Sequence, residues 1–218
     1  MSSSVDQTRL PARWEPIARR TVDLMVVVIA LLVLAIPMLL IAIAVRCDSR
    51  GPAFYRQQRI GRNRQPFTMY KFRTMRVGGS DAEHRDLIAR ELRGENTAVN
   101  GSWKIDHDPR VTRVGAFLRR TSPDELPQLI NVLRGQMSLV GPRPCLDWEA
   151  EMFPARFAKR FDVPPGLTGL WQVSGRSTMG TLEMLELDLT YVRECSFWND
   201  LGILFRTVPA VLRGQGAR

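Results

Sequence analysis

An uninterrupted apolar run from Leu24 to Val45, LMVVVIALLVLAIPMLLIAIAV, is the strongest feature of the hydrophobic pattern. It contains no charged residue. At about 1.5 Å per residue, a straight helix of this length would just cross a hydrocarbon core of about 30 Å. The pattern therefore predicts a membrane helix. Pro37 lies inside the run, where proline removes a backbone hydrogen bond and bends a helix.

Basic residues flank both ends of this run. Because positive residues prefer the cytoplasmic side of a membrane, a simple crossing would strand one of the two sets outside. A helix that enters, bends at Pro37 and returns keeps both sets at one face. We therefore favour a re-entrant helix over residues 21–46, and disfavour a simple span or a buried core helix. The basic residues are Arg9, Arg13, Arg19 and Arg20 before the run, and Arg46, Arg50, Arg56, Arg59, Arg62 and Arg64 after it.

The pattern changes to short alternating segments after the run. PAFYRQQRIG and PFTMYKFRTM alternate aromatic or apolar residues with polar ones, and RNRQ separates them. This predicts a β-hairpin. From Gly51 to Gly79 there are seven basic residues and no acidic one, so the hairpin has a basic face. Such a face is either a solvated edge or a contact for anionic lipid head groups.

The rest of the chain is mainly helical. Helices are predicted at Asp81–Leu92, Pro123–Arg134 and Thr181–Tyr191, and an amphipathic one at 196–214 that faces either a membrane interface or the core. GQMSLVGPRP is expected to be a turn-rich connector, and VPPGLTGLWQVSGR to hold a short strand. The predicted fold class is α+β, mainly helical, with amphipathic interfacial helices. Residues 1–20 form a leader, 21–46 the membrane helix and 47–218 a domain on the cytoplasmic face.

The amino-acid composition limits the classes of partner and of site that the protein can have. The chain has 31 Lys and Arg against 22 Asp and Glu, which favours anionic partners such as phosphorylated substrates, anionic lipid or nucleic acid. Three cysteines without CxxC spacing argue against a disulfide framework, and two histidines argue against a zinc site. No GxxxxGK[ST] or GxGxxG phosphate loop and no GxSxG nucleophile turn is present.

The stretch TSPDELPQL, residues 121–129, has two interpretations. Ser122 and Glu125 have the spacing of a capping box, and Pro123 suits the first position of a helix. Acids in a first turn also complement the helix dipole. Alternatively, Asp124 and Glu125 are placed for chemistry on a phosphate, which binds at helix N-termini. On these residues alone the structural interpretation is favoured.

Several basic residues lie in turn-rich positions that a phosphate site would use. They are Lys71 and Arg73 in YKFRTM, Arg119 and Arg120 before the acidic pair, and Arg143 in GPRP. At the start of a helix Asp124 would stay ionised, as a carboxylate nucleophile must. Two carboxylates among arginines can also hold Mg²⁺ against phosphate oxygens. Each feature taken singly is as well explained by capping acids, surface ion pairs or solvated arginines.

Four ordered stretches together resemble the monotopic phosphoglycosyl transferases, bacterial sugar transferases that act on polyprenyl phosphate. They are GPAFYRQQRIGRNRQPFTMYKFRTM, DPRVTRVGAFLRRTSPDELPQLINVLRGQMSLVGPRP, PPGLTGLWQVSGRS and LDLTYVRECSFWNDLGILFRTV. With the membrane run they cover most of the chain, and Asp81–Gly101 matches least. The resemblance implies a minimal catalytic unit without the additional membrane-spanning domain of larger relatives. Many members have Ser before the helix-breaking proline, whereas this chain has Ile36.

The resemblance also implies roles for named residues. Asp124 would attack the β-phosphorus of a UDP-sugar, releasing UMP, and undecaprenyl phosphate would then take the phosphosugar from the aspartate. Glu125 would hold Mg²⁺, together with Asp124, or assist proton transfer. Residues expected to carry phosphate charge or line the site are Lys71, Arg73, Arg119, Arg143, Asp188 and Tyr191.

The same resemblance implies the location and pathway. The enzyme would work at the cytoplasmic (inner) membrane in contact with anionic lipids, in exopolysaccharide or other surface glycoconjugate synthesis. The closing FRTVPAVLRGQGA weakly favours UDP-glucose or UDP-galactose. A non-enzymatic, basic, membrane-anchored protein that binds lipid or a partner is the alternative. Nucleic acid is not an expected partner, since no recognition motif is present, and nothing in the sequence indicates an oligomeric state.

Overall fold

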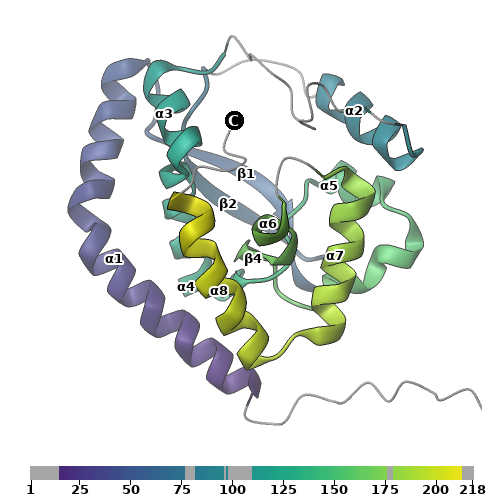
Figure 1. Ribbon diagram of the computed structural model, residues 1–218. Helices are drawn as coiled ribbons and strands as arrows, with labels where there is room; N and C mark the ends of the chain where they lie inside the picture. The colour runs from purple at the N-terminus through teal and green to yellow at the C-terminus, as the bar shows by residue number, and fades with distance from the viewer. Residues whose placement is uncertain (1–14, 77–81, 96, 98–109, 176–178, 213–218) are drawn as a thin grey trace, which may run out of the picture.

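The computed structural model describes residues 15–76, 82–95, 97, 110–175 and 179–212. The fold is mainly helical α+β, with two small sheets among the helices (Figure 1). Residues 1–14 of the predicted leader and most of residues 94–108 lie outside the described residues. The elements in chain order are α1 (Glu15–Asp48), β1 (Phe54–Ile60), η1 (Arg62–Arg64), β2 (Pro66–Phe72), α2 (Ala82–Leu92), α3 (Arg113–Thr121), η2 (Pro123–Gln128), α4 (Leu129–Leu133), β3 (Ser138–Val140), α5 (Asp147–Met152), η3 (Ala155–Phe161), β4 (Gly166–Thr168), α6 (Leu170–Ser174), α7 (Thr181–Glu194) and α8 (Phe197–Leu212).

Helix α1 runs without interruption for 34 residues and includes Pro37. It is longer than the predicted 21–46, and at 1.5 Å per residue it extends for about 50 Å. Figure 1 shows it curving along one side of the molecule. It is the one helix in the described part of the chain that is long and apolar enough to cross a membrane.

The two ends of α1 are attached to the same body of the protein. Near its start, Asp23 accepts hydrogen bonds from the Ser138 hydroxyl at 2.7 Å and from the Leu139 backbone N–H at 3.1 Å. At its other end, the Asp48 carboxylate accepts from the backbone N–H of Val114 at 3.0 Å. Val45 packs against Phe72 and Leu118 close by. Both attachments are made to elements that follow α1 in the chain, β3 and α3 included.

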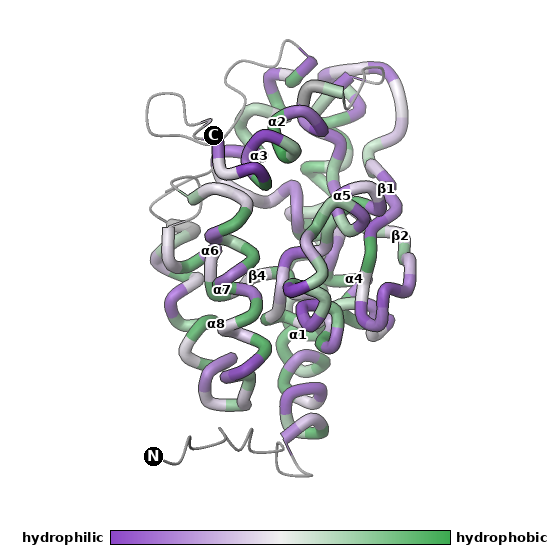
Figure 2. The backbone as a smooth tube through the Cα atoms, turned by 90° about the vertical axis from the view of Figure 1, so that its right-hand side faces the viewer, coloured by the Kyte–Doolittle hydropathy of each residue, from purple (hydrophilic) through white to green (hydrophobic). Residues whose placement is uncertain are grey.

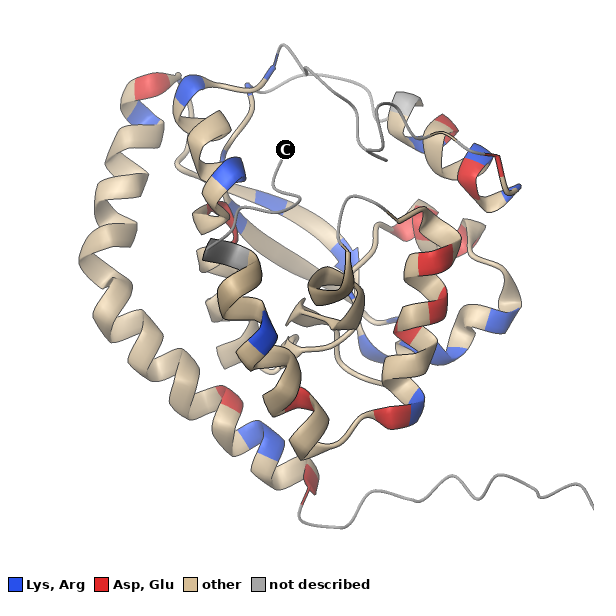
Figure 3. Ribbon diagram, in the orientation of Figure 1, with Lys and Arg blue, Asp and Glu red and all other residues tan. Residues whose placement is uncertain are grey.

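The middle of α1 is the part that the protein leaves uncovered. Leu32 is 75% exposed and Ile36 is 72% exposed, although both are large apolar side chains. Figure 3 shows no charged residue along this stretch, whereas charged residues lie at both ends of the helix. Exposed apolar side chains also occur on α8, at Trp198, Phe205 and Val208. Contiguous apolar surface of this kind marks a contact with lipid or with another protein.

Strands β1 and β2 form the predicted hairpin, paired antiparallel with Tyr55 opposite Lys71 and Arg59 opposite Phe67. Side chains alternate between the two faces of a strand, so these four residues share one face. The second sheet joins β3 to β4 in parallel, with Ser138 opposite Gly166. Strand β3 lies in the segment predicted to be only a turn-rich connector. Its three residues are buried, and such a short run gives too little pattern to be recognised.

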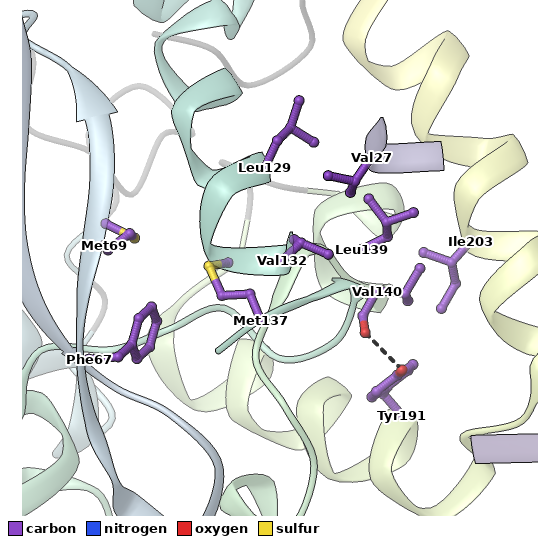
Figure 4. Packing of buried hydrophobic residues seen from close by; sticks show 10 residues of the cluster. All are labelled: Val27, Phe67, Met69, Leu129, Val132, Met137, Leu139, Val140, Tyr191 and Ile203. Carbon is purple, nitrogen blue, oxygen red and sulfur yellow. Dashed lines mark hydrogen bonds between the residues drawn. The ribbon is translucent and has the colours of Figure 1, made fainter. Parts of the chain in front are cut away.

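The main core lies between the hairpin on one side and α1, α7 and α8 on the other (Figure 4). Phe67 and Met69 enter it from β2, and Val132 and Met137 from α4 and the turn that follows. Figure 2 shows that hydrophobic and hydrophilic segments alternate along the chain trace. The full set of buried residues is Val27, Phe67, Met69, Leu129, Val132, Met137, Leu139, Val140, Tyr191 and Ile203.

The predicted helix at Pro123–Arg134 is divided in two, and the prediction of a capping box at Ser122 and Glu125 is wrong. Ser122 has a left-handed backbone (φ 67°, ψ 10°), ends α3 and makes no capping hydrogen bond with its side chain. The segment after it is the 3-10 helix η2, followed by the short helix α4. Pro127 cannot donate a backbone hydrogen bond, which is consistent with this break. Helix α3 itself was not predicted.

Candidate active site

The acidic pair lies in the first turn of η2, beside strand β2. The Lys71 ammonium donates a hydrogen bond to the Glu125 carboxylate, with Nζ and Oε1 3.0 Å apart. The Arg143 guanidinium approaches the same oxygen at 3.5 Å. Asp124 is half-buried next to this group. The structure therefore brings together Lys71, Asp124, Glu125 and Arg143, which come from three separate parts of the sequence.

Burial sets the electrostatics of this cluster. It lowers the pKa of Lys71, and the negative charge of Glu125 opposes that change. It raises the pKa of Asp124 above its usual range, opposed by Lys71 and reinforced by the charge of Glu125. Asp124 is thus a carboxylate whose solvation is reduced and whose acidic neighbour, Glu125, is paired with Lys71 and Arg143.

Arg143 is carried by the GPRP loop after β3, and a buried ion pair holds that loop in place. Arg160 donates to the backbone carbonyl of Arg143 at 2.9 Å and approaches the Cys145 sulfur at 3.2 Å. The same guanidinium donates to Asp188 Oδ2 at 2.8 and 3.1 Å. Burial raises the pKa of Asp188, against the lowering effect of the Arg160 charge. Asp188 therefore lies behind the site and supports it through Arg160.

Tyr191 lies in a different cluster, away from the acidic pair. Its hydroxyl is 2.8 Å from Asp200 Oδ1 and 3.1 Å from the Val140 carbonyl oxygen, and it accepts from Arg19 at 2.7 Å. Arg19 also donates to Asp200 at 2.6 Å. These contacts connect α1, β3, α7 and α8, and the structure does not bring Tyr191 to the acidic pair.

Of the other two predicted phosphate-binding residues, Arg73 is placed elsewhere. Arg73 is buried at the end of α1, where its guanidinium donates to the carbonyl oxygens of Ser49 at 2.7 Å, Val45 at 3.3 Å and also Arg50. Cations are favourable at this end of a helix dipole. Arg119 is exposed in the last turn of α3, and among the described residues no ion pair joins it to Asp124 or Glu125.

A pocket adjoins the acidic pair, and some of its lining was not expected from the sequence. Arg59 and Gln128 contribute to it together with Lys71, Glu125 and Arg143. The alternation of the hairpin could have identified Arg59, because it shares a strand face with Met69 and Lys71. The complete lining is Arg59, Met69, Lys71, Glu125, Gln128, Arg143, Pro144, Gly166 and Leu167.

The acidic pair supplies two carboxylates for a metal ion. No group of three or more His, Cys, Asp and Glu residues that could hold a metal occurs in the described part of the chain. Mg²⁺ is commonly bound through one or two carboxylates, with substrate phosphates and water completing its octahedral shell. Asp124 and Glu125 fit this mode of binding, and they do not form a complete protein cage.

The protein has a mainly helical body with one long apolar helix, which is typical of a membrane-associated protein. Its carboxylate pair among basic side chains is suited to phosphate chemistry. The chain belongs to the bacterial sugar transferase family, whose model matches residues 14–214. It is 42% identical over 203 residues to the galactosyl transferase CpsE of Streptococcus agalactiae serotype III (strain NEM316), which covers 93% of this chain and 44% of that protein.

Two further relatives are similar over most of the chain. The exopolysaccharide production protein ExoY of Rhizobium meliloti (strain 1021) is 41% identical over 204 residues, which are 92% of this chain and 88% of that protein. The undecaprenyl-phosphate galactose phosphotransferase of Salmonella typhimurium (strain LT2) is 40% identical over 215 residues, or 97% of this chain and 44% of that protein. The chain thus spans less than half the length of the Streptococcus and Salmonella proteins.

Proposed function

We propose that this protein transfers a sugar 1-phosphate from a UDP-sugar to undecaprenyl phosphate and releases UMP, as the first step of exopolysaccharide or related glycoconjugate synthesis. Family membership and the names of the Salmonella and Rhizobium relatives support this reaction class and pathway. The single observation that carries the chemistry is the position of Asp124 beside Glu125, Lys71 and Arg143.

In the proposed mechanism Asp124 is the nucleophile. One of its carboxylate oxygens forms a bond to the β-phosphorus, while the bond from that phosphorus to the bridging oxygen breaks. The electron pair remains on the bridging oxygen, which leaves as part of the UMP phosphate. An oxygen of undecaprenyl phosphate then forms a bond to the same phosphorus and releases the aspartate, giving a diphosphate-linked sugar.

The surroundings of the two acids support this division of roles. Glu125 is held by Lys71 at 3.0 Å and faces Arg143 at 3.5 Å, so its charge is largely engaged. Burial reduces the solvation of the Asp124 carboxylate, and reduced solvation makes an anion more reactive. Lys71 and Arg143 are placed to stabilise charge on the transferring phosphate, the main contribution that proteins make to phosphoryl transfer. When bound by Asp124, Glu125 and the donor phosphates, Mg²⁺ would neutralise further phosphate charge.

The attachment of α1 supports a re-entrant position in the membrane. Both of its ends are joined to the same folded body, through Asp23 and Asp48, and a folded body cannot lie on both sides of a bilayer. The exposed apolar middle around Ile36 would then enter the lipid and return, with Pro37 nearby. The basic flanks favour the cytoplasmic face for that body, where anionic lipids would contact the basic residues.

The direct test is UMP release by the purified protein supplied with UDP-glucose or UDP-galactose, undecaprenyl phosphate and Mg²⁺. Asp124→Asn should lower turnover by orders of magnitude and keep its fold and membrane association, because an amide lacks the charge to attack phosphorus. Ser122→Ala is the matched control, since Ser122 lies two residues away and makes no capping bond. Near-normal turnover by Asp124→Asn would exclude the covalent mechanism. A wild-type protein that binds lipid but releases no UMP from any UDP-sugar would favour the non-enzymatic alternative.

A further inference from the structure

Arg59 lines the pocket beside the acidic pair, but nothing in the proposed mechanism yet uses it. It comes from β1, and the hairpin register places its side chain on the same face as Met69 and Lys71. The pocket therefore has Lys71 toward one end of the hairpin and Arg59 toward the other. The two residues lie four positions apart along the ladder, about 13 Å between backbone positions at 3.3 Å per residue.

The guanidinium of Arg59 is held firmly, yet one of its donors remains unused. Its terminal nitrogens donate to Gln57 Oε1 at 2.7 Å and to the Pro144 carbonyl oxygen at 3.3 Å. The carboxylate of Glu149 is 3.6 Å away. The Nε atom is buried and finds no hydrogen-bond partner among the described residues. Buried donors without partners are rare in folded proteins, and each one requires an explanation.

The charge around Arg59 favours an anion. Its nearest carboxylate, Glu149, is shared, because it also accepts from the Leu146 backbone N–H at 2.6 Å. Burial lowers the pKa of Arg59; Glu149 opposes this, and the nearby charge of Arg143 adds to it. Arg143 also acts to lower the pKa of Lys71. Arg59, Arg143 and Lys71 are thus three cations that line one pocket, a combination that an incoming polyanion would stabilise.

A sugar nucleotide brings two phosphates to this pocket. Lys71 and Arg143 lie beside the acidic pair and serve the phosphate that becomes bonded to Asp124. We propose that Arg59 binds the other one, the α-phosphate that leaves with the nucleoside, through its preorganised guanidinium. This inference rests on the proposed function, because it assigns a residue to the leaving group of that reaction.

In this position Arg59 would help to bind the sugar nucleotide and would also help its UMP group to leave. When the bond between the β-phosphorus and the bridging oxygen breaks, the electron pair adds negative charge to the α-phosphate. A fixed arginine that donates hydrogen bonds to this phosphate stabilises the transition state, in which this charge develops, more than the ground state. Gln57 and the Pro144 carbonyl hold the guanidinium so that little reorganisation is needed.

Binding of UMP and of uridine to the full-length protein in detergent tests this assignment. Arg59→Met should weaken UMP by about tenfold to a hundredfold, the usual effect of a lost hydrogen bond to a charged group. Uridine, which lacks the phosphate, should bind Arg59→Met and wild type equally. Arg56→Met is the matched control: Arg56 is exposed on the opposite face of β1, with its guanidinium 5.9 Å from the Tyr70 ring centre, and both ligands should be unaffected.

Unchanged UMP affinity in Arg59→Met, or equal weakening of UMP and uridine, would overturn the proposal and leave Arg59 as a support for the GPRP loop. Arg59→Lys covers the case in which Arg59→Met does not fold. It keeps one positive charge without the planar donor set, so it should restore UMP binding only in part, and full wild-type affinity would contradict the assignment. Because these measurements need no turnover, Arg59-dependent UMP binding without UMP release from UDP-sugars would reject the proposed function alone.

Discussion

Asp124 and Glu125 are adjacent in the sequence but differ in their surroundings. Glu125 is paired with Lys71 and Arg143, whereas burial raises the pKa of Asp124. A carboxyl whose folded-state pKa is raised lowers stability once the pH exceeds its unfolded value of about 3.9. This cost is absent when the group is protonated in both states.

The raised pKa predicts opposite effects of Asp124→Asn on stability and on activity. At pH 7 the variant should melt at a higher temperature than wild type, because the amide has no charge to desolvate. Below about pH 3.5 the difference should disappear. Thermal melting of both proteins at the two pH values checks this. A variant that is less stable than wild type at pH 7 would contradict the direction of the pKa shift.

At the scale of elements, the hairpin, α2, α7 and α8 follow from periodicity, while α3, β3 and the break at Pro127 do not. Long segments with a clear period identify themselves. Strand β3 has three residues and is specified by its burial against β4. The sequence also indicated Lys71, Arg143 and the acidic pair, which the fold brings together. The sequence could not separate Lys71 from Arg73, because the two residues stand in the same alternation of aromatic and basic residues. Only the packing shows that Arg73 binds the end of α1 instead of the acidic pair.

Arg73→Met should therefore destabilise the protein by about 2–4 kcal/mol, since it removes charged hydrogen bonds from a buried guanidinium to three carbonyl groups at the end of α1. Arg76→Met, at an exposed position nearby, should change stability by less than about 0.5 kcal/mol. Unfolding in detergent measures both. If Arg73→Met lost UMP release and kept wild-type stability, Arg73 would be a phosphate-binding residue instead.

At the scale of the whole molecule, one long apolar helix would attach the protein to the membrane, and the folded body carries the candidate site. Both ends of α1 are joined to that body, which supports the re-entrant position that we propose from the basic flanks. Its exposed apolar middle would anchor the body at the interface, where the proposed lipid-linked acceptor and water-soluble donor would meet.

Cysteine labelling in intact cells checks this topology. Ser3→Cys and Ser80→Cys, each in a protein with Cys47, Cys145 and Cys195 replaced by Ala, should both resist a membrane-impermeant thiol reagent and react after the cells are opened. The same reagent on a periplasmic cysteine serves as the control. Labelling of one of the two sites in intact cells would show that α1 crosses the membrane.

The covalent route through Asp124 is the central claim, and mass analysis of the trapped enzyme tests it most directly. The purified protein is incubated with a UDP-sugar and Mg²⁺ but no undecaprenyl phosphate, then quenched in acid and digested. A peptide containing Asp124 should gain the mass of one hexose phosphate, in equal amount to the UMP released, and later addition of undecaprenyl phosphate should remove it. Asp124 and Glu125 are adjacent and lie in the same peptide, so the Glu125→Gln variant distinguishes them. A hexose phosphate on that variant's peptide would have to be bonded to Asp124. UMP release that requires undecaprenyl phosphate and leaves every peptide unmodified would contradict the account and indicate direct transfer between the two substrates.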